Sequence, residues 1–209
     1  MNTTRASLLM RVKNRDDGPA WAEFHELYAP LLYRYARARG LGRQDAEEIR
    51  DQCLLIIARK IGAFEYDKRK GGFKNWLYTI ASGKVIDLLR SRRMPIADSR
   101  DLDGLSDPAP APDEAWERQW KDQHLRYCVE QVRGSVSEAN YRAFHLLVLE
   151  GCSVEEVCTS LDMNANRVYK AKSRVLRVVQ RKLAELAPDL WPNEHPPLAG
   201  SDASARPCS

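Results

Sequence analysis

The sequence predicts an all-α protein with two small helical domains joined by a flexible linker rich in Pro and Asp. Apolar residues recur every three or four positions along most of the chain, as they do in amphipathic helices. We find no stretch with the alternating pattern of a half-buried strand. Residues 96–113 are acidic, and the alternating prolines Pro108, Pro110 and Pro112 oppose a helix there. We therefore expect a domain over 1–95, a linker over 96–113, a domain over 114–187 and a disordered tail over 188–209.

The first domain is expected to be a set of helices. Leu8, Leu9 and Val12 indicate a short first helix. Pro19 suits the first turn of a second helix, which Pro30 should kink or break. The glycines Gly40 and Gly42 end this unit.

A long helix is expected to open near Asp45, which stands at the capping-box spacing from Glu48. Its predicted core face comprises Ala46, Ile49, Cys53, Ile56, Ile57, Ile61 and Phe64. A basic loop over 68–72 then leads into another helix from Phe73 to about Arg93.

Residues 153–182 predict a helix-turn-helix. Ser153 and Glu156 have the spacing of a capping box, Asp162 tolerates the left-handed conformation of a turn, and Asn164 can cap the next helix. That second helix separates two faces. One is apolar, with Val168, Val175, Val179, Leu183 and Leu186, and the other is basic, with Arg167, Lys170, Arg174, Arg177 and Arg181.

The basic face indicates a nucleic-acid partner. Between Arg167 and Lys182 there are seven Lys and Arg and no Asp or Glu. A solvated helix face usually mixes both signs, with pairs four residues apart. An α-helix fits the major groove of DNA, where its first turns meet base edges and flanking cations meet phosphates.

Composition argues against several other classes of protein. The sequence contains no run of about 18 apolar residues, so it predicts no membrane span. The first residues lack a secretory h-region, and we therefore expect a cytoplasmic protein. The five cysteines are odd in number and widely spaced, which disfavours a disulfide framework. A metal site from Cys128, His145, Cys152 and Cys158 is conceivable, but buried thiols fit these cysteines better. We expect no metal and no cofactor.

Two segments together resemble a known family. DAEEIRDQCLLIIARKIGAF, a basic loop and GFKNWLYTIASGKVIDLLRSRR resemble region 2 of bacterial sigma-70 factors, above all those of the extracytoplasmic function (ECF) group. The stretch Glu150–Val157 resembles the start of region 4 in the same proteins. The resemblance implies two helical domains that act as a specificity subunit of RNA polymerase.

The resemblance also implies partners and site residues. Core RNA polymerase would be bound through the clamp helices of its largest subunit and through the flap. The largest subunit would contact an acidic face of the helix that opens near Asp45, made of Glu47, Glu48, Asp51 and Gln52. The −10 element of promoter DNA would be recognised and melted by Lys68, Arg69, Lys70, Phe73, Asn75, Lys84, Arg90 and Arg93. The −35 element would be read by Asn164, Asn166, Arg167, Lys170, Lys172, Arg174 and Arg177.

Two positions depart from the family pattern, and one aromatic residue has a simpler explanation. Ser82 and Gly83 stand where the family often has arginine and asparagine, so contacts there are expected to differ. Trp76, with Leu77, Ile80 and Val85, is expected to belong to the core rather than to contact a base.

The leading hypothesis is therefore a sigma factor without catalytic chemistry of its own, and an anti-sigma partner is a further expectation of the resemblance. The alternative is a one-component DNA-binding regulator whose N-terminal domain senses a signal or dimerises. An enzyme is not expected, because the sequence contains no Gly-rich phosphate loop, nucleophile elbow or HExxH motif.

Overall fold

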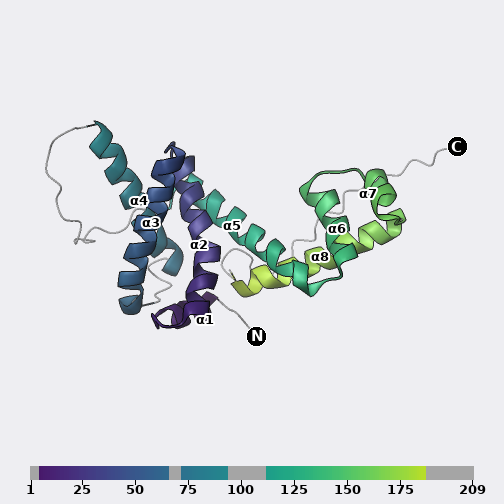
Figure 1. The fold of residues 1–209 in the computed structure, drawn as a ribbon, viewed down its shortest axis with the longest axis horizontal. Coiled ribbons are helices and arrows are strands. Elements are labelled where there is room, and N and C mark those ends of the chain that lie inside the picture. The colour runs from purple at the N-terminus through teal and green to yellow at the C-terminus, as the bar shows by residue number, and fades with distance from the viewer. Residues whose placement is uncertain (1–4, 66–71, 94–111, 187–209) are drawn as a thin grey trace.

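The computed structural model describes residues 5–65, 72–93 and 112–186, and all the regular structure in these ranges is helical. The all-α prediction is confirmed. Figure 1 shows the N-terminal helices α1 to α4 in one lobe, the C-terminal helices α6 to α8 in another, and α5 between them. The predicted tail, most of the predicted linker and most of the basic loop lie outside the described residues.

The N-terminal lobe holds α1 (Arg5–Val12), α2 (Gly18–Ala38), α3 (Arg43–Lys60) and α4 (Gly72–Arg93), with a short 3-10 turn at Ile61–Ala63. The rest comprises α5 (Glu114–Val132), a 3-10 turn at Arg133–Ser135, α6 (Glu138–Phe144), a π-helical turn at His145–Leu149, α7 (Val154–Leu161) and α8 (Ala165–Leu186).

The start of α2 is fixed by a side-chain cap. The Asp17 carboxylate accepts the Ala20 N–H at 2.9 Å and forms an ion pair with Arg11 at 3.0 Å. The hydrogen bond from Arg11, helped by the one from Ala20, lowers the pKa of Asp17. Pro19 lies in the first turn, as predicted.

The structure contradicts a break at Pro30 and a capping box at Asp45. Helix α2 runs through Pro30 without a break, because buried side chains on both sides of it, from Phe24 to Tyr35, anchor the two halves in one core. Helix α3 begins after Gly42 and has no side-chain cap, so Asp45 does not form a capping box. Asp45 instead forms an ion pair with Arg92 at the end of α4.

The core of the N-terminal lobe is aromatic. Phe24 lies 4.6 Å from Tyr28 between ring centroids, and Phe73 meets both rings edge-on. From α3, Ala46, Ile49, Cys53 and Ile57 are buried against the same cluster, as are Leu77, Ile80 and Val85 of α4. These contacts fix α3 and α4 relative to each other and therefore fix the faces that they expose.

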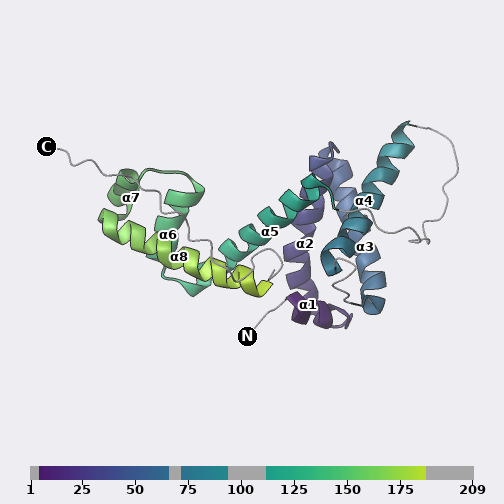
Figure 2. The ribbon, with the colours of Figure 1, turned by 180° about the vertical axis from the view of Figure 1, so that it is seen from behind.

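Helix α5 connects the two lobes, as Figure 2 shows from behind. Its first half carries Trp116 and Trp120, both fully buried against α2 and α4, and its second half packs on α8. One hydrophobic cluster thus runs from α1 through α5 to Leu186 of α8. The C-terminal lobe adds a second, small core of Ala143, Val157, Met163, Val168 and Ala171.

Candidate nucleic-acid interface

The turn between α7 and α8 has the geometry that the sequence predicts. The Ser153 backbone N–H donates to Glu156 Oε2 at 2.7 Å, and the Glu156 N–H donates back to Ser153 Oγ at 3.3 Å, which completes the capping box. Asp162 ends α7 in the left-handed conformation at φ 51°. Asn164 Oδ1 then accepts the Arg167 N–H at 2.9 Å and caps α8.

The capping box also shifts the pKa of the Glu156 carboxylate. Hydrogen bonds from the backbone and the hydroxyl of Ser153 lower the pKa of Glu156, so the box is intact at neutral pH. Because a depressed folded-state pKa stabilises the fold above the ordinary value, this contribution is lost as the pH falls into the acidic range. The orientation of α7 before the turn is therefore held by an ionised side chain.

Helix α8 separates its faces as predicted. Val168, Val175, Val179, Leu183 and Leu186 are buried, and so is Ala171. The basic residues on the opposite side, Arg167, Lys170, Arg174, Arg177 and Arg181, are all exposed. Asn166 is exposed as well, whereas Lys172 is half-buried. The arrangement presents a cationic strip that is exposed from the first turn of α8, as insertion into a major groove needs.

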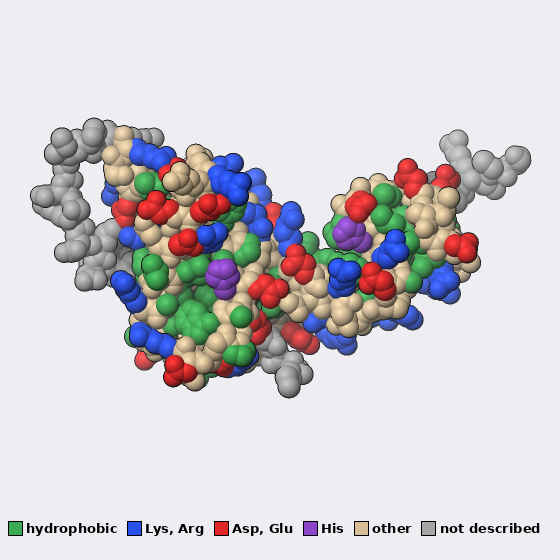
Figure 3. Space-filling view, viewed as in Figure 1, with side chains coloured by type: hydrophobic (Ala, Val, Ile, Leu, Met, Phe, Trp, Pro, Cys, Tyr) green, Lys and Arg blue, Asp and Glu red, His purple; other side chains and the backbone are tan. Residues whose placement is uncertain are grey.

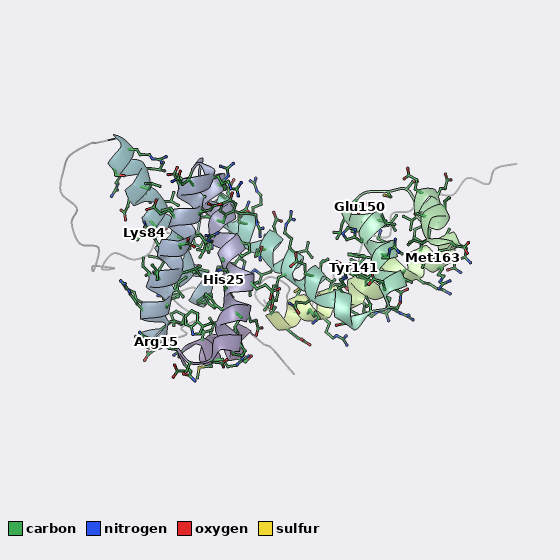
Figure 4. All side chains as sticks on the ribbon, viewed as in Figure 1. Arg15, His25, Lys84, Tyr141, Glu150 and Met163 are labelled. Atoms are coloured by element: carbon green, nitrogen blue, oxygen red, sulfur yellow. The ribbon has the colours of Figure 1, made fainter. Side chains whose placement is uncertain are left out.

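Helix α4 places the other predicted DNA-binding residues unevenly. Arg90 is exposed, and Asn75 and Lys84 are half-buried. Lys68, Arg69 and Lys70 lie outside the described residues, and so does the side chain of Arg93. Figure 4 labels Lys84 on the N-terminal lobe and Met163 at the far end of the C-terminal lobe, so the two candidate DNA surfaces lie at opposite ends of the chain.

The assignment of Phe73 to DNA contact needs correction. Its ring is fully buried and packs edge-on against Phe24, Tyr28 and Phe64, so it has no free face on which a base could stack. Trp76 packs between Phe64 and Phe73 at the border of the core, in agreement with its predicted core role. The aromatic residues after the basic loop therefore hold α4 in place.

The two family departures lie next to each other in the middle of α4. Ser82 is buried, and its hydroxyl donates to the Thr79 carbonyl at 3.4 Å. A Cβ added to Gly83 would meet no atom within 4 Å among the described residues. Packing in this structure therefore does not demand the glycine at position 83.

Helix α3 exposes the predicted acidic face. Glu48 and Asp51 are exposed, and Glu47 and Gln52 are half-buried. Each is engaged within its own helix: Arg43 pairs with Glu47 at 3.1 Å, Arg50 with Asp51 at 2.7 Å, and Gln52 donates to Glu48 at 2.9 Å. The hydrogen bond from Arg50 lowers the pKa of Asp51. Figure 3 shows acidic and apolar side chains close together over this part of the lobe.

Two residues of this surface escaped the sequence reasoning. Leu55 follows Asp51 by one helical turn and is 60% exposed, so the acidic face includes a large apolar side chain. Its position four residues after Asp51 is a signal that the sequence did contain. Arg92, near the end of α4, forms an ion pair with Asp45 in the first turn of α3. No sequence spacing connects these two residues, because the contact joins separate helices.

The comparisons with known proteins agree with this arrangement. Residues 24–94 match the family model described as sigma-70 region 2. The chain is also similar to the ECF RNA polymerase sigma factor BldN of Streptomyces coelicolor, with 25% identity over 190 residues that cover 90% of this chain and 68% of BldN. The matched region and the similarity to BldN support an ECF factor of the sigma-70 family. The same findings support a sigma factor role in transcription initiation.

Other relatives carry similar names. The chain is 25% identical to the ECF RNA polymerase sigma factor SigE of Mycolicibacterium smegmatis over 173 residues, covering 81% of this chain and 65% of SigE. It is 25% identical to RpoE of Cereibacter sphaeroides over 142 residues, covering 68% and 76%. A chain of the RsbN–BldN complex is similar at 20% identity and a TM-score of 0.34, covering 83% of this chain and 97% of that one, a likeness too low to carry an argument.

Two further features bear on other classes of protein. Within the described ranges, no helix is long and apolar enough to cross a membrane. The same part of the chain has no group of His, Cys, Asp or Glu that could hold a metal ion. Cys53 and Cys128 are buried free thiols, and burial raises the pKa of each to about 12.

Proposed function

We propose that this chain acts as a sigma factor that binds core RNA polymerase through the outer face of α3 and directs it to promoters through the basic face of α8. The basic loop over 68–72, together with α4, would help to melt the −10 element. The observation that carries the proposal is the complete separation of charge on α8. Every basic residue of the predicted stripe is exposed, and every apolar residue of the opposite face is buried.

The capped turn before α8 supports the −35 assignment. Because Asn164 Oδ1 accepts the Arg167 N–H, the Asn164 side chain helps to orient the helix, and the residue itself is exposed. Asn166, Arg167 and Lys170 occupy the first exposed turns of α8. These positions meet base edges in a docked recognition helix, whereas Lys172, Arg174 and Arg177 lie further along, where phosphates are contacted.

The acidic face of α3 supports the polymerase assignment. Glu48 and Asp51 are exposed and lie beside the apolar Leu55. A face that combines carboxylates with one large apolar side chain suits a partner helix that is basic and has an apolar pocket. The clamp helices of the largest subunit are the proposed partner here, and the flap is the proposed partner of the C-terminal lobe.

Transcription in vitro tests the proposal directly. Purified chain, core polymerase and a template with a matched promoter should give a discrete transcript, and neither protein should give it alone. A template with a scrambled −35 element serves as the matched control. Absence of both a transcript and binding to core polymerase would overturn the proposal. Tight, specific binding to promoter duplex without polymerase would instead support a one-component regulator.

The absence of enzymatic activity is also a proposal. The chain is expected to show no nucleolytic or ATPase activity above background at high protein concentration. Turnover that co-purifies with the chain and disappears with a point substitution would contradict it. The anti-sigma partner and the cytoplasmic location stay predictions, which co-purification and cell fractionation would test.

A further inference from the structure

A polar groove lies on the N-terminal lobe where α2, α3 and the second half of α5 meet. Its volume is about 490 Å³, which falls in the range typical of small-molecule sites. We call it the arginine groove, because Arg34 of α2, Arg50 of α3 and Arg126 of α5 all line it. Three helices thus bring three guanidinium groups to one groove.

Arg34 presents a hydrogen-bonding edge that the fold does not use. Its Nε and Nη2 atoms are buried, and neither finds an acceptor among the described residues. These two nitrogens lie on the same edge of the planar guanidinium, and together they form the fork that binds two oxygens of a phosphate or a carboxylate. A buried donor without a partner costs free energy, which an anionic ligand would return.

The charges around Arg34 favour an anion with more than one negative charge. Burial lowers the pKa of the Arg34 guanidinium, and Arg126 lowers it further, whereas Asp122 and Glu130 act in the opposite direction. Arg34 and Arg126 therefore repel each other, and an anion bound to both would relieve that repulsion. A phosphate monoester suits this position better than a carboxylate, since it carries a charge of about −1.5 to −2 at neutral pH.

Arg50 contributes less free charge to the groove. Its Nε and Nη2 atoms donate to the Asp51 carboxylate at 2.7 and 3.0 Å, so this guanidinium already has an anionic partner. Arg34 and Arg126 are therefore the main anchors for an anion, and Arg50 adds to the positive potential from the side of α3.

Other lining residues fit an organic body with hydroxyl groups. Gln123 is buried, and its amide can both donate and accept hydrogen bonds. Glu26 and Glu130 are exposed carboxylates, which disfavour a second phosphate group but accept hydrogen bonds from hydroxyls. Pro30 and Tyr33 are half-buried and provide an apolar wall.

The groove lies away from the surfaces proposed to contact DNA. Its described lining residues come from α2, α3 and α5, and not from α4 or α8. Figure 4 labels His25, which also lines the groove, in the middle of the N-terminal lobe, and Met163 at the far end of the other lobe. His25 is exposed, and Figure 3 shows a histidine open to solvent on this face. A small molecule can therefore reach the groove from solvent.

We propose that the arginine groove binds a phosphorylated small molecule with a hydroxylated body, such as a sugar phosphate or a nucleotide. The fork of Arg34 holds the phosphate together with Arg126, and the carboxylates of Glu26 and Glu130 accept hydrogen bonds from the hydroxyl groups. The site lies outside the polymerase and promoter surfaces described above and adds a ligand to the chain.

Isothermal titration calorimetry on the full chain tests the site. Ribose 5-phosphate should bind saturably, ribose should not bind because it lacks the phosphate, and inorganic phosphate should bind severalfold more weakly because it lacks the hydroxylated body. Adenosine 5′-monophosphate distinguishes the two sources of the phosphate: tighter binding than ribose 5-phosphate indicates a nucleotide, and weaker binding indicates a sugar phosphate. Absence of saturable binding for both esters at millimolar concentration would overturn the proposal.

Substitutions assign the binding to the groove. Arg34→Lys keeps a positive charge but loses the fork, and it should weaken binding about tenfold, the effect of losing one charge-assisted hydrogen bond. Arg126 is exposed, so Arg126→Gln leaves the fold intact and should weaken binding by a similar factor. Arg118→Gln, exposed on the same helix and outside the groove, is the matched control and should bind normally. Equal losses in Arg118→Gln and Arg126→Gln would refute a specific site.

Duplex DNA is the competing occupant, because its backbone also carries phosphates. Fluorescence anisotropy of a labelled duplex separates the two cases. Arg126→Gln should leave the affinity of the full chain for the duplex unchanged while it weakens binding of ribose 5-phosphate. A parallel loss of affinity for both would assign the groove to backbone contacts and contradict a small-molecule site.

The site and the proposed function fail separately, since every titration uses the chain without polymerase. A chain that binds ribose 5-phosphate but gives no promoter-directed transcript would keep the site and lose the function. A chain that transcribes but binds neither ester would keep the function and lose the site.

Discussion

At the scale of single residues, burial decides which side chains can react. The Cys53 thiol is fully enclosed between α3 and α4, with its sulfur 4.0 Å from the Ile80 carbonyl oxygen. Cys128 is enclosed between α5 and α8. Burial raises the pKa of both thiols to about 12, so they stay protonated at neutral pH.

We expect these two thiols to resist alkylation in the folded chain. With a pKa near 12, about one thiol in ten thousand is ionised at pH 8, and the thiolate is the nucleophile. Cys152 and Cys158, which are half-buried, should react first with iodoacetamide, as peptide mass spectrometry would show. Rapid labelling of Cys53 below the denaturation midpoint would contradict the packing of α3 on α4.

The same two thiols predict a pH dependence of stability. Because their folded-state pKa lies above the ordinary value near 9, the unfolded chain loses these protons first as the pH rises. Stability should therefore be complete below about pH 9 and fall between pH 9 and 12, as urea unfolding at several pH values would show. Cys53→Ala with Cys128→Ala should make that fall shallower, and an unchanged slope would contradict it.

Arg167 is the residue on which promoter choice is expected to depend most. Its side chain is exposed at the start of α8, and Ala preserves the helix. Arg167→Ala should cost about 1–3 kcal/mol of discrimination at one position of the −35 element and leave binding to core polymerase unchanged. Arg181→Ala, at the far end of the same face, should weaken binding about equally for all sequences. Competition between promoter variants measures both effects.

At the scale of helices, capping and side-chain spacing account for most of the boundaries. The Ser153 capping box, the left-handed Asp162 and the Asn164 cap are all short-range features, so the sequence predicts α7 and α8 correctly. Helix α3 is different. The acidic residues at its start suggest a capping box, but Asp45 is drawn to Arg92 of another helix, and Gly42 precedes the first turn.

The middle of α4 offers a test of its local stability. A mid-helix glycine costs about 1 kcal/mol relative to alanine, and a Cβ at Gly83 would touch nothing within 4 Å among the described residues. Gly83→Ala should therefore raise the free energy of unfolding by about that amount in chemical denaturation. If stability rises while promoter melting falls, the glycine serves close approach to DNA. A loss of stability would show that α4 is bent or crowded there.

At the scale of the whole molecule, substitutions on the acidic face of α3 and on the basic face of α8 are expected to have independent effects. Glu48→Lys with Asp51→Lys should weaken binding to core polymerase about tenfold, because reversed charges oppose a basic partner, and should leave the relative affinity for promoter variants unchanged. Fluorescence titration of labelled chain with core polymerase measures the first effect. Glu138→Lys, exposed on the C-terminal lobe, is the control. Equal losses in the pair and in the control would contradict the α3 assignment.

The linker prediction shows what a composition argument can and cannot reach. The linker predicted from the prolines and aspartates after Pro95 lies almost entirely outside the described residues. The same argument treats Glu114 as the start of an independent domain. In the structure, Trp116 and Trp120 complete the core of the N-terminal lobe, so α5 belongs to both lobes. Their spacing of four residues indicates a buried face but cannot indicate which core receives it.

The sequence by itself determined the helical class, the family, the helix-turn-helix and the two faces of α8, because these depend on periodicity and on contacts within a few residues. The tertiary structure decided what depends on contacts between distant helices. In the tertiary structure Phe73 is buried, and α2 continues through Pro30. Asp45 pairs with Arg92, and α5 packs on α2 and α4. The physical reason is that burial is shared among helices, and its assignment to a particular pair follows from their packing rather than from any local pattern.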